Sequence, residues 1–220
     1  MKKFIVLVSA LLIAASASAQ KSFDNEFYFR FGYSNPSWKQ LGADKDDWVD
    51  GWKKKGFTGE IGTIFMLNKV LNSDKMALGI DVDYLTFYWH QFTNDQAGSS
   101  VDLATLRVGS KVGPSFTFTP AKRLAFDIYV KADISWVTAT AIVRDNNSDD
   151  ALGFGKVFAV GFSTGFNVRY SVLMIGFEFN TISPKLEDVD NPGEYLGNFN
   201  DSSSDKTPLP SMSFTIGLSF

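Results

Sequence analysis

Charged side chains recur at alternate positions of several otherwise apolar segments. Because strand side chains alternate between two faces, these charges fall on one face of each predicted strand. The set holds five basic and six acidic residues: Arg30, Arg107, Lys111, Lys131 and Arg169, with Glu60, Asp81, Asp83, Asp127, Asp133 and Glu178. Buried charges of nearly balanced sign are tolerated when they pair with one another. The pattern therefore predicts a lumen filled by ion pairs, and a proton relay or ion path stays open as the alternative.

The order of the segments also predicts partners within this set. Asp81 and Asp83 share the inner face of one predicted strand, and Arg107 and Lys111 share that of the next. Opposite charges on neighbouring strands stabilise the pairing of the two strands. We therefore expect these two acids to meet these two bases.

The segment Asp145 to Asp150 places oxygen-bearing side chains at the first, third and fifth positions of a calcium-binding loop. The remaining positions do not fit such a loop. Asp150 replaces the glycine of the sharp turn, and Lys156 replaces the bidentate glutamate at position twelve. We expect a solvated acidic loop here, with no metal site and no cofactor anywhere in the chain.

Three tryptophans, Trp38, Trp48 and Trp52, lie among aspartates and next to the run Lys53 to Lys55. Aromatic side chains mixed with charges are typical of binding surfaces. They are also typical of packed loops and of belts at a membrane interface. We interpret this stretch as a possible partner-binding loop, with the belt as the alternative.

The elements that must position these residues are strands. Residues 211–220 alternate apolar and small polar side chains without a slip, and the final apolar positions are Phe214, Ile216, Leu218 and Phe220. Seven earlier segments show the same period of two: 27–33, 57–67, 76–89, 106–118, 124–136, 158–170 and 173–181.

The connections between these segments alternate between long and short. The long ones are 34–55, 92–100, 144–155 and 183–210, and the short ones are 68–75, 119–122 and 171–172. This rhythm is typical of membrane barrels. The sequence therefore predicts an all-β fold, an eight-stranded antiparallel up-and-down transmembrane β-barrel with long extracellular loops and short periplasmic turns.

The first residues have the features of a secretion signal. Lys2 and Lys3 precede an apolar run, and Ala17-Ser18-Ala19 supplies small residues for cleavage. We expect a signal peptide at 1–19 and one barrel domain at 20–220. Without Lys2 and Lys3, 19 basic residues face 24 acidic ones, so the mature chain carries about −5. An acidic chain of this kind is not expected to bind nucleic acid.

The signal, the eight alternating segments, the loop rhythm and the terminal Phe220 together resemble the small eight-stranded outer-membrane barrels, the family of outer-membrane proteins A and X. The resemblance implies multi-pass insertion in the outer membrane of a Gram-negative bacterium, after export through a cleaved signal peptide. It implies contact with outer-membrane lipid and lipopolysaccharide, and recognition of the last strand by the barrel-assembly machinery. It also implies a non-enzymatic structural or surface-interaction role, in adhesion or envelope integrity, toward an extracellular partner that the sequence does not identify. Unlike outer-membrane protein A, the chain carries no predicted peptidoglycan-binding domain.

Three other functions stay open at this stage. A lipid-modifying enzyme would use His90, the single histidine, as a base with a nearby serine such as Ser99 or Ser100. The residues after His90 lack the histidine-x-serine pattern of the lipid-A deacylases, so we expect a loop or headgroup-level histidine. A narrow channel would need an uncharged lumen or one with charges of a single sign, and a secreted lipocalin-like barrel would turn its apolar face inward.

Overall fold

The computed structural model describes residues 24–37, 52–67, 71, 73–96, 99–145, 148–153, 157–184 and 208–220. Its strands are β1 (Glu26–Pro36), β2 (Lys53–Leu67), β3 (Met76–Gln96), β4 (Ser99–Ala121), β5 (Leu124–Asp145), β6 (Ser148–Gly153), β7 (Val157–Tyr170), β8 (Leu173–Ile182) and β9 (Ser211–Ser219). The expected signal peptide lies outside these residues and stays a prediction. Within them, no helix has the length and apolar character needed to cross a membrane.

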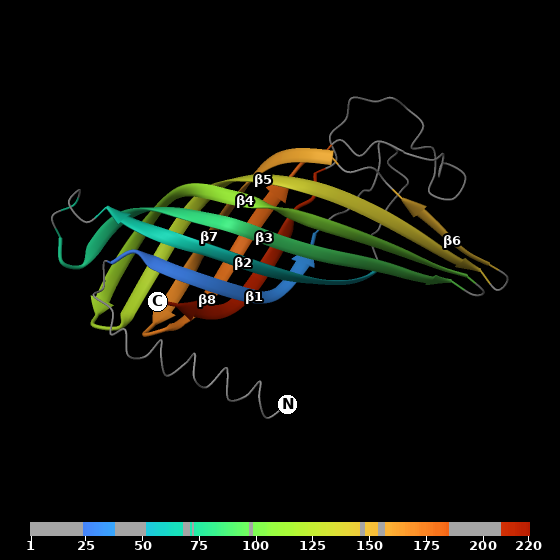
Figure 1. Ribbon diagram of the computed structural model, residues 1–220. Helices are drawn as coiled ribbons and strands as arrows, with labels where there is room; N and C mark the ends of the chain where they lie inside the picture. Colours follow the sequence, from blue (N-terminus) through green and yellow to red (C-terminus); the bar gives the residue numbers. More distant parts are fainter. Residues whose placement is uncertain are drawn as a thin grey trace, which may run out of the picture.

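The strands close into an antiparallel barrel (Figure 1). Each strand of the wall pairs with the next one, with β7 following β5, and β1 pairs with β9 to complete the circle. The short strand β6 pairs only with the last part of β5, so eight strands form the wall and β6 extends it at one end. The predicted eight-stranded, antiparallel all-β barrel is therefore confirmed.

The two ends of the barrel differ in their connections. We call the end with the connections 68–75, 122–123 and 171–172 the turn end, and the opposite end the loop end. β3, β4 and β5 are the longest strands and project at the loop end, where β6 is added (Figure 1). The barrel thus carries a sheet extension on one side of its loop end.

This extension corrects the predicted loops. β3 and β4 stay paired up to Gln96 and Ser99, and β5 and β6 up to Asp145 and Ser148. The predicted loops 92–100 and 144–155 are therefore largely strand, and 34–55 is shortened at both ends. The predictions were wrong because ladder hydrogen bonds satisfy the backbone whether or not the side chains are apolar.

The two faces of the wall have opposite character. Large apolar side chains cover the outside, with Phe31 61% and Trp136 59% exposed, whereas the lumen side is mostly polar and charged. This is the arrangement of a membrane barrel. It is the reverse of a lipocalin-like barrel, so that alternative is wrong.

A β-bulge in β3 changes which residues face inward. The register against β4 jumps between Asp83 and Thr86, and Tyr84 and Leu85 both face outward. Beyond the bulge the parity of the strand is reversed. Asp81 and Asp83 face the lumen before the bulge, and Thr86, Tyr88 and His90 face it afterwards.

Candidate functional site: the charged lumen

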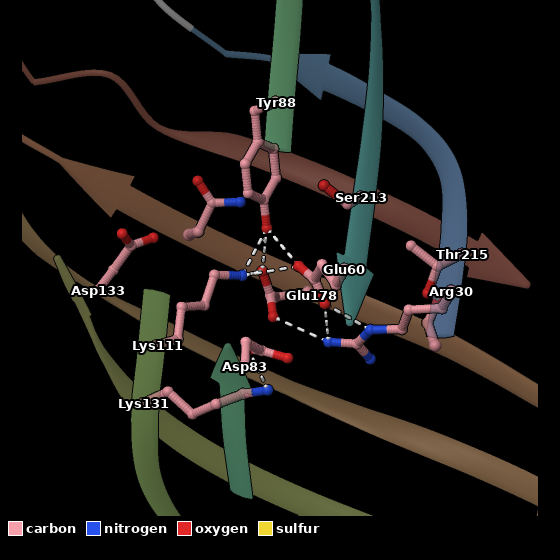
Figure 2. A network of polar contacts seen from close by, with 12 residues as sticks. Arg30, Glu60, Asp83, Tyr88, Lys111, Lys131, Asp133, Glu178, Ser213 and Thr215 are labelled. Atoms are coloured by element: carbon pink, nitrogen blue, oxygen red, sulfur yellow. Dashed lines mark hydrogen bonds and ion pairs between the residues drawn. The ribbon is translucent and has the colours of Figure 1, made fainter. Parts of the chain in front are cut away.

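Four charges from four strands form the centre of the lumen (Figure 2). Arg30 on β1 forms ion pairs with Glu60 on β2 and, at 3.3 Å, with Glu178 on β8. Lys111 Nζ on β4 lies 2.8 Å from Glu60 Oε1 and 2.5 Å from Glu178 Oε1. Each carboxylate therefore contacts both cations. All four side chains are at most 3% exposed. Because they come from β1, β2, β4 and β8, this ring links strands across the lumen.

Tyrosine side chains fill the space around this ring. Tyr88 Oη accepts a hydrogen bond from Lys111 at 2.5 Å, and Arg30 donates to Tyr129 Oη at 3.1 Å. The Arg107 guanidinium lies 3.7 Å from the centre of the Tyr88 ring, where a cation is attracted by the π-face. The rings thus bury cations against apolar surface while their hydroxyls join the hydrogen-bond network.

Glycines in the neighbouring strands make room for Tyr129 and for Tyr28, a further lumen tyrosine on β1. An added Cβ at Gly62 would lie 2.6 Å from Tyr28 Oη, and one at Gly165 would lie 2.6 Å from Tyr129 Oη. Each tyrosine therefore packs directly on backbone, which is the close approach that favours glycine in a strand.

A second group lies between β1, β3 and β5. Lys131 Nζ is 3.0 Å from Asp81 Oδ2 and 2.7 Å from Asp83 Oδ2. The Tyr28 hydroxyl contacts the Oδ1 atoms of both carboxyls, at 2.6 Å for Asp81. One ammonium group and one hydroxyl thus contact both carboxyl groups.

Two further groups complete the network. Arg169 Nε donates to Asp127 Oδ2 at 2.7 Å, and the same guanidinium forms an ion pair with Glu26. Arg107 lies 3.5 Å from Asp133 and donates to Asn180 Oδ1 at 2.9 Å.

Apolar side chains lie on both sides of the charges. Toward the turn end, Ile64, Met66, Ala77 and Met174 form a buried cluster with Tyr28. Toward the loop end, the buried inward side chains are Phe92, Leu103, Ile182 and Leu209. The Leu209 N–H donates to the Ile182 carbonyl at 2.7 Å, which holds this residue against β8. Buried apolar side chains therefore lie toward both ends of the barrel from the central ring, and the Glu26–Asp127–Arg169 group lies level with the turn-end cluster, since Glu26 pairs with Ile64 and Arg169 with Met174.

All eleven charged residues predicted for the lumen are buried there. The expected partners were wrong: Asp81 and Asp83 pair with Lys131 from β5, while Lys111 reaches across to Glu60 and Glu178. The side chains cross the lumen, so the strand order along the wall does not decide which charges meet.

Sequence reasoning missed several members of the network. They are Glu26, Tyr28, Tyr88, Asn167 and Asn180. Glu26 is the first residue of its strand, and the bulge moves Tyr88 inward. The alternation of Tyr28 with Phe27 and Phe29 was the available signal, because it puts the tyrosine on the same face as Arg30.

His90 lies within β3 and not in a loop, so the expectation of a loop histidine was wrong, while its depth relative to the lipid headgroups stays a prediction. The bulge turns it into the lumen, where it is 5% exposed and its Nε2 lies 2.8 Å from Ser34 Oγ. Ser213 Oγ in turn donates to Ser34 Oγ at 3.0 Å. The serine partner thus comes from β1 and not from Ser99 or Ser100.

The other predicted sites are placed only in part. Trp52 is half-buried just before β2, and Trp38 and Trp48 lie outside the described residues. Asp145 and Ser148 face each other across the β5–β6 hairpin, and 146–147 are not described. In the described part of the chain, no group of three or more acidic or histidine side chains is arranged to hold a metal ion.

The last strand closes the wall, as its alternation predicted. Phe214 and Ile216 face outward, and the Phe220 ring stacks on Phe27 with 5.9 Å between ring centres. The Phe27 N–H donates to the Phe220 carbonyl at 2.9 Å. Recognition of Phe214, Ile216, Leu218 and Phe220 by the assembly machinery stays a prediction.

Comparison with known proteins gives one family match. The model of the outer membrane protein beta-barrel domain matches residues 5–219. Among solved structures, the attachment invasion locus protein Ail of Yersinia pestis is 11% identical, with 91% of this chain and 100% of that chain covered and a TM-score of 0.44. The outer membrane protease OmpT of Escherichia coli is 10% identical, with 92% and 99% covered and a TM-score of 0.48. No curated protein matches, and likenesses this distant carry no argument about activity.

Proposed function

The chain belongs to the family of outer membrane protein β-barrel domains, and we propose that it is a structural or surface-interaction protein of the Gram-negative outer membrane whose lumen does not conduct ions. The observation that carries this proposal is the buried charge network. An eight-stranded barrel has an interior just wide enough for side chains, and here side chains occupy it.

The network argues against an ion path. For ions to cross a charged barrel, the lumen side chains must be able to leave their ion pairs and bind the passing ion instead. Each lumen base here lies within ion-pair distance of at least one lumen acid, for example Lys111 with Glu60 and Glu178. Breaking such a buried pair from one side typically costs about 3–5 kcal/mol. Buried apolar side chains also lie toward both ends. The charges are therefore expected to hold the wall together.

The loop end supports a surface role. β3, β4, β5 and β6 carry the sheet beyond the rest of the wall. The connection that contains Trp38, Trp48 and Trp52 in the sequence joins β1 and β2 at this same end. Aromatic residues in a connection held by rigid strands are common at binding sites. We propose that these tryptophans contact an extracellular partner, and that outer-leaflet lipid or lipopolysaccharide surrounds the barrel.

A lipid-modifying enzyme is the second candidate, because Ser34 and His90 form the hydrogen-bonded pair that a serine nucleophile requires. The location of the pair argues against this function. Ser34 and His90 are 0% and 5% exposed and face the lumen, whereas lipid contacts the outside of the wall.

The proposed role is tested in the native host. A strain lacking the protein would be complemented with the wild type, with Trp38→Ser/Trp48→Ser/Trp52→Ser, or with a control carrying Trp136→Phe on the outer face of the wall. We expect the triple variant to fold and to lose attachment of cells to their natural surfaces, while the control retains it. Attachment unchanged by the triple variant would contradict the partner-binding loop.

A further inference from the structure

The Asp81–Asp83 group differs from the central ring in its charge balance, and the Glu26–Asp127–Arg169 group has the same ratio of two acids to one cation. At the centre, Glu60 and Glu178 share two cations, Arg30 and Lys111. Asp81 and Asp83 share one: among the described residues, Lys131 is the single cation within ion-pair distance of either. If both acids were ionised, this group would carry one uncompensated negative charge with all three charged side chains 0% exposed.

Such a charge is strongly disfavoured. An isolated carboxylate away from water is so costly that the group normally becomes neutral instead. The further charges that act on Asp83 do not remove the imbalance: Glu60 is negative, and the ammonium group of Lys111 is already shared by Glu60 and Glu178. The group therefore needs one more positive charge than its side chains supply.

The hydrogen bonds show where that charge fits. Lys131 Nζ faces the Oδ2 atoms of both acids, and the Tyr28 hydroxyl contacts both Oδ1 atoms. A hydroxyl has one hydrogen to donate. Both contacts become hydrogen bonds when one carboxyl carries a hydrogen and donates it to Tyr28 Oη. That oxygen then donates its own hydrogen to the other carboxylate and also faces Lys131 Nζ at 3.4 Å.

We infer that the Asp81–Asp83 pair binds one proton, shared through the Tyr28 hydroxyl, so that the lumen holds one acid and one carboxylate on Lys131. Tyr88 also contacts two carboxylates, but Lys111 donates to the same Oε1 atoms, and the charges there balance without a proton. The bound proton makes the group electrically neutral, as the central ring is.

Infrared spectroscopy of the refolded protein in lipid vesicles at neutral pH tests this inference, because a protonated carboxyl has a carbonyl stretch that a carboxylate lacks. The wild type should show this band. Asp81→Asn and Asp83→Asn should each weaken it by the contribution of one carboxyl, since the remaining acid then forms a one-to-one pair with Lys131. A contribution from Glu26 and Asp127, which share Arg169, would remain in both variants. The control Asp74→Asn, in the exposed connection between β2 and β3, should leave the band unchanged.

Two results would overturn the inference. The first is a wild-type spectrum without the band, which requires no variant to fold. The second is a band that persists unchanged in folded Asp81→Asn and folded Asp83→Asn, because the proton would then be bound elsewhere. Folding of each variant is checked by the shift in gel mobility between unheated and heated samples. None of these outcomes depends on a surface partner, so the inference and the proposed function can fail separately.

Discussion

Replacement of Lys111 by methionine removes a cation from the centre of the lumen and keeps a side chain of similar length. Glu60 and Glu178 would then share Arg30 alone. Both carboxylates are at most 3% exposed, so water does not replace the lost ammonium group. Removing one partner of a buried pair typically costs about 3–5 kcal/mol. We therefore expect Lys111→Met to lower the free energy of unfolding by about that amount.

The measurement is urea unfolding of the barrel in detergent micelles, followed by tryptophan fluorescence and by the heat-dependent shift on gels. The matched control is Lys122→Met, which makes the same change on an exposed side chain at the turn end and should alter stability by less than about 0.5 kcal/mol. If Lys111→Met unfolds within about 1 kcal/mol of the wild type, the network does not stabilise the barrel as argued.

The remaining predictions concern packing, chemistry and orientation. Gly165→Ala should cost about 1–3 kcal/mol, because the added methyl meets the Phe177 carbonyl oxygen and the Tyr129 side chain, whereas Gly59→Ala, whose nearest neighbour would be 3.9 Å away, should be tolerated in the same urea assay. His90→Ala should leave lipid A acylation unchanged in mass spectra of envelope lipid, and a change would favour the enzyme. Trypsin added to intact cells should cut within 38–51 and spare the turn at 122–123; cutting at the turn alone would reverse the orientation.

Much of the fold follows from period-two alternation. The charges inside and the aromatics outside were predictable for β5, where Asp127, Lys131 and Asp133 alternate with apolar residues over the whole span. Polar stretches were read as loops, although the hairpins at Gln96 and Ser148 are strand pairs. Outside the lipid, strand pairing leaves no apolar signal in the sequence.

Which lumen residues pair with one another was less predictable than which residues face the lumen. A bulge of one residue turned Tyr88 and His90 inward, and local sequence gives little sign of such a bulge. Lys111 spans the lumen to β8, a contact between residues 67 positions apart. Alternation predicts the face of a residue, whereas its partner across a closed barrel depends on the tilt and stagger of all the strands.

Single-channel recording in a planar lipid bilayer tests the central claim most directly. The refolded wild-type protein should insert without producing steady ion conductance, because paired charges fill the lumen and buried apolar side chains lie toward both of its ends. Lys111→Met, in the fraction that folds, is not expected to conduct either, since the methionine still occupies the space. Steady conductance from the wild type would show that the charged lumen is a path for ions and would contradict the account.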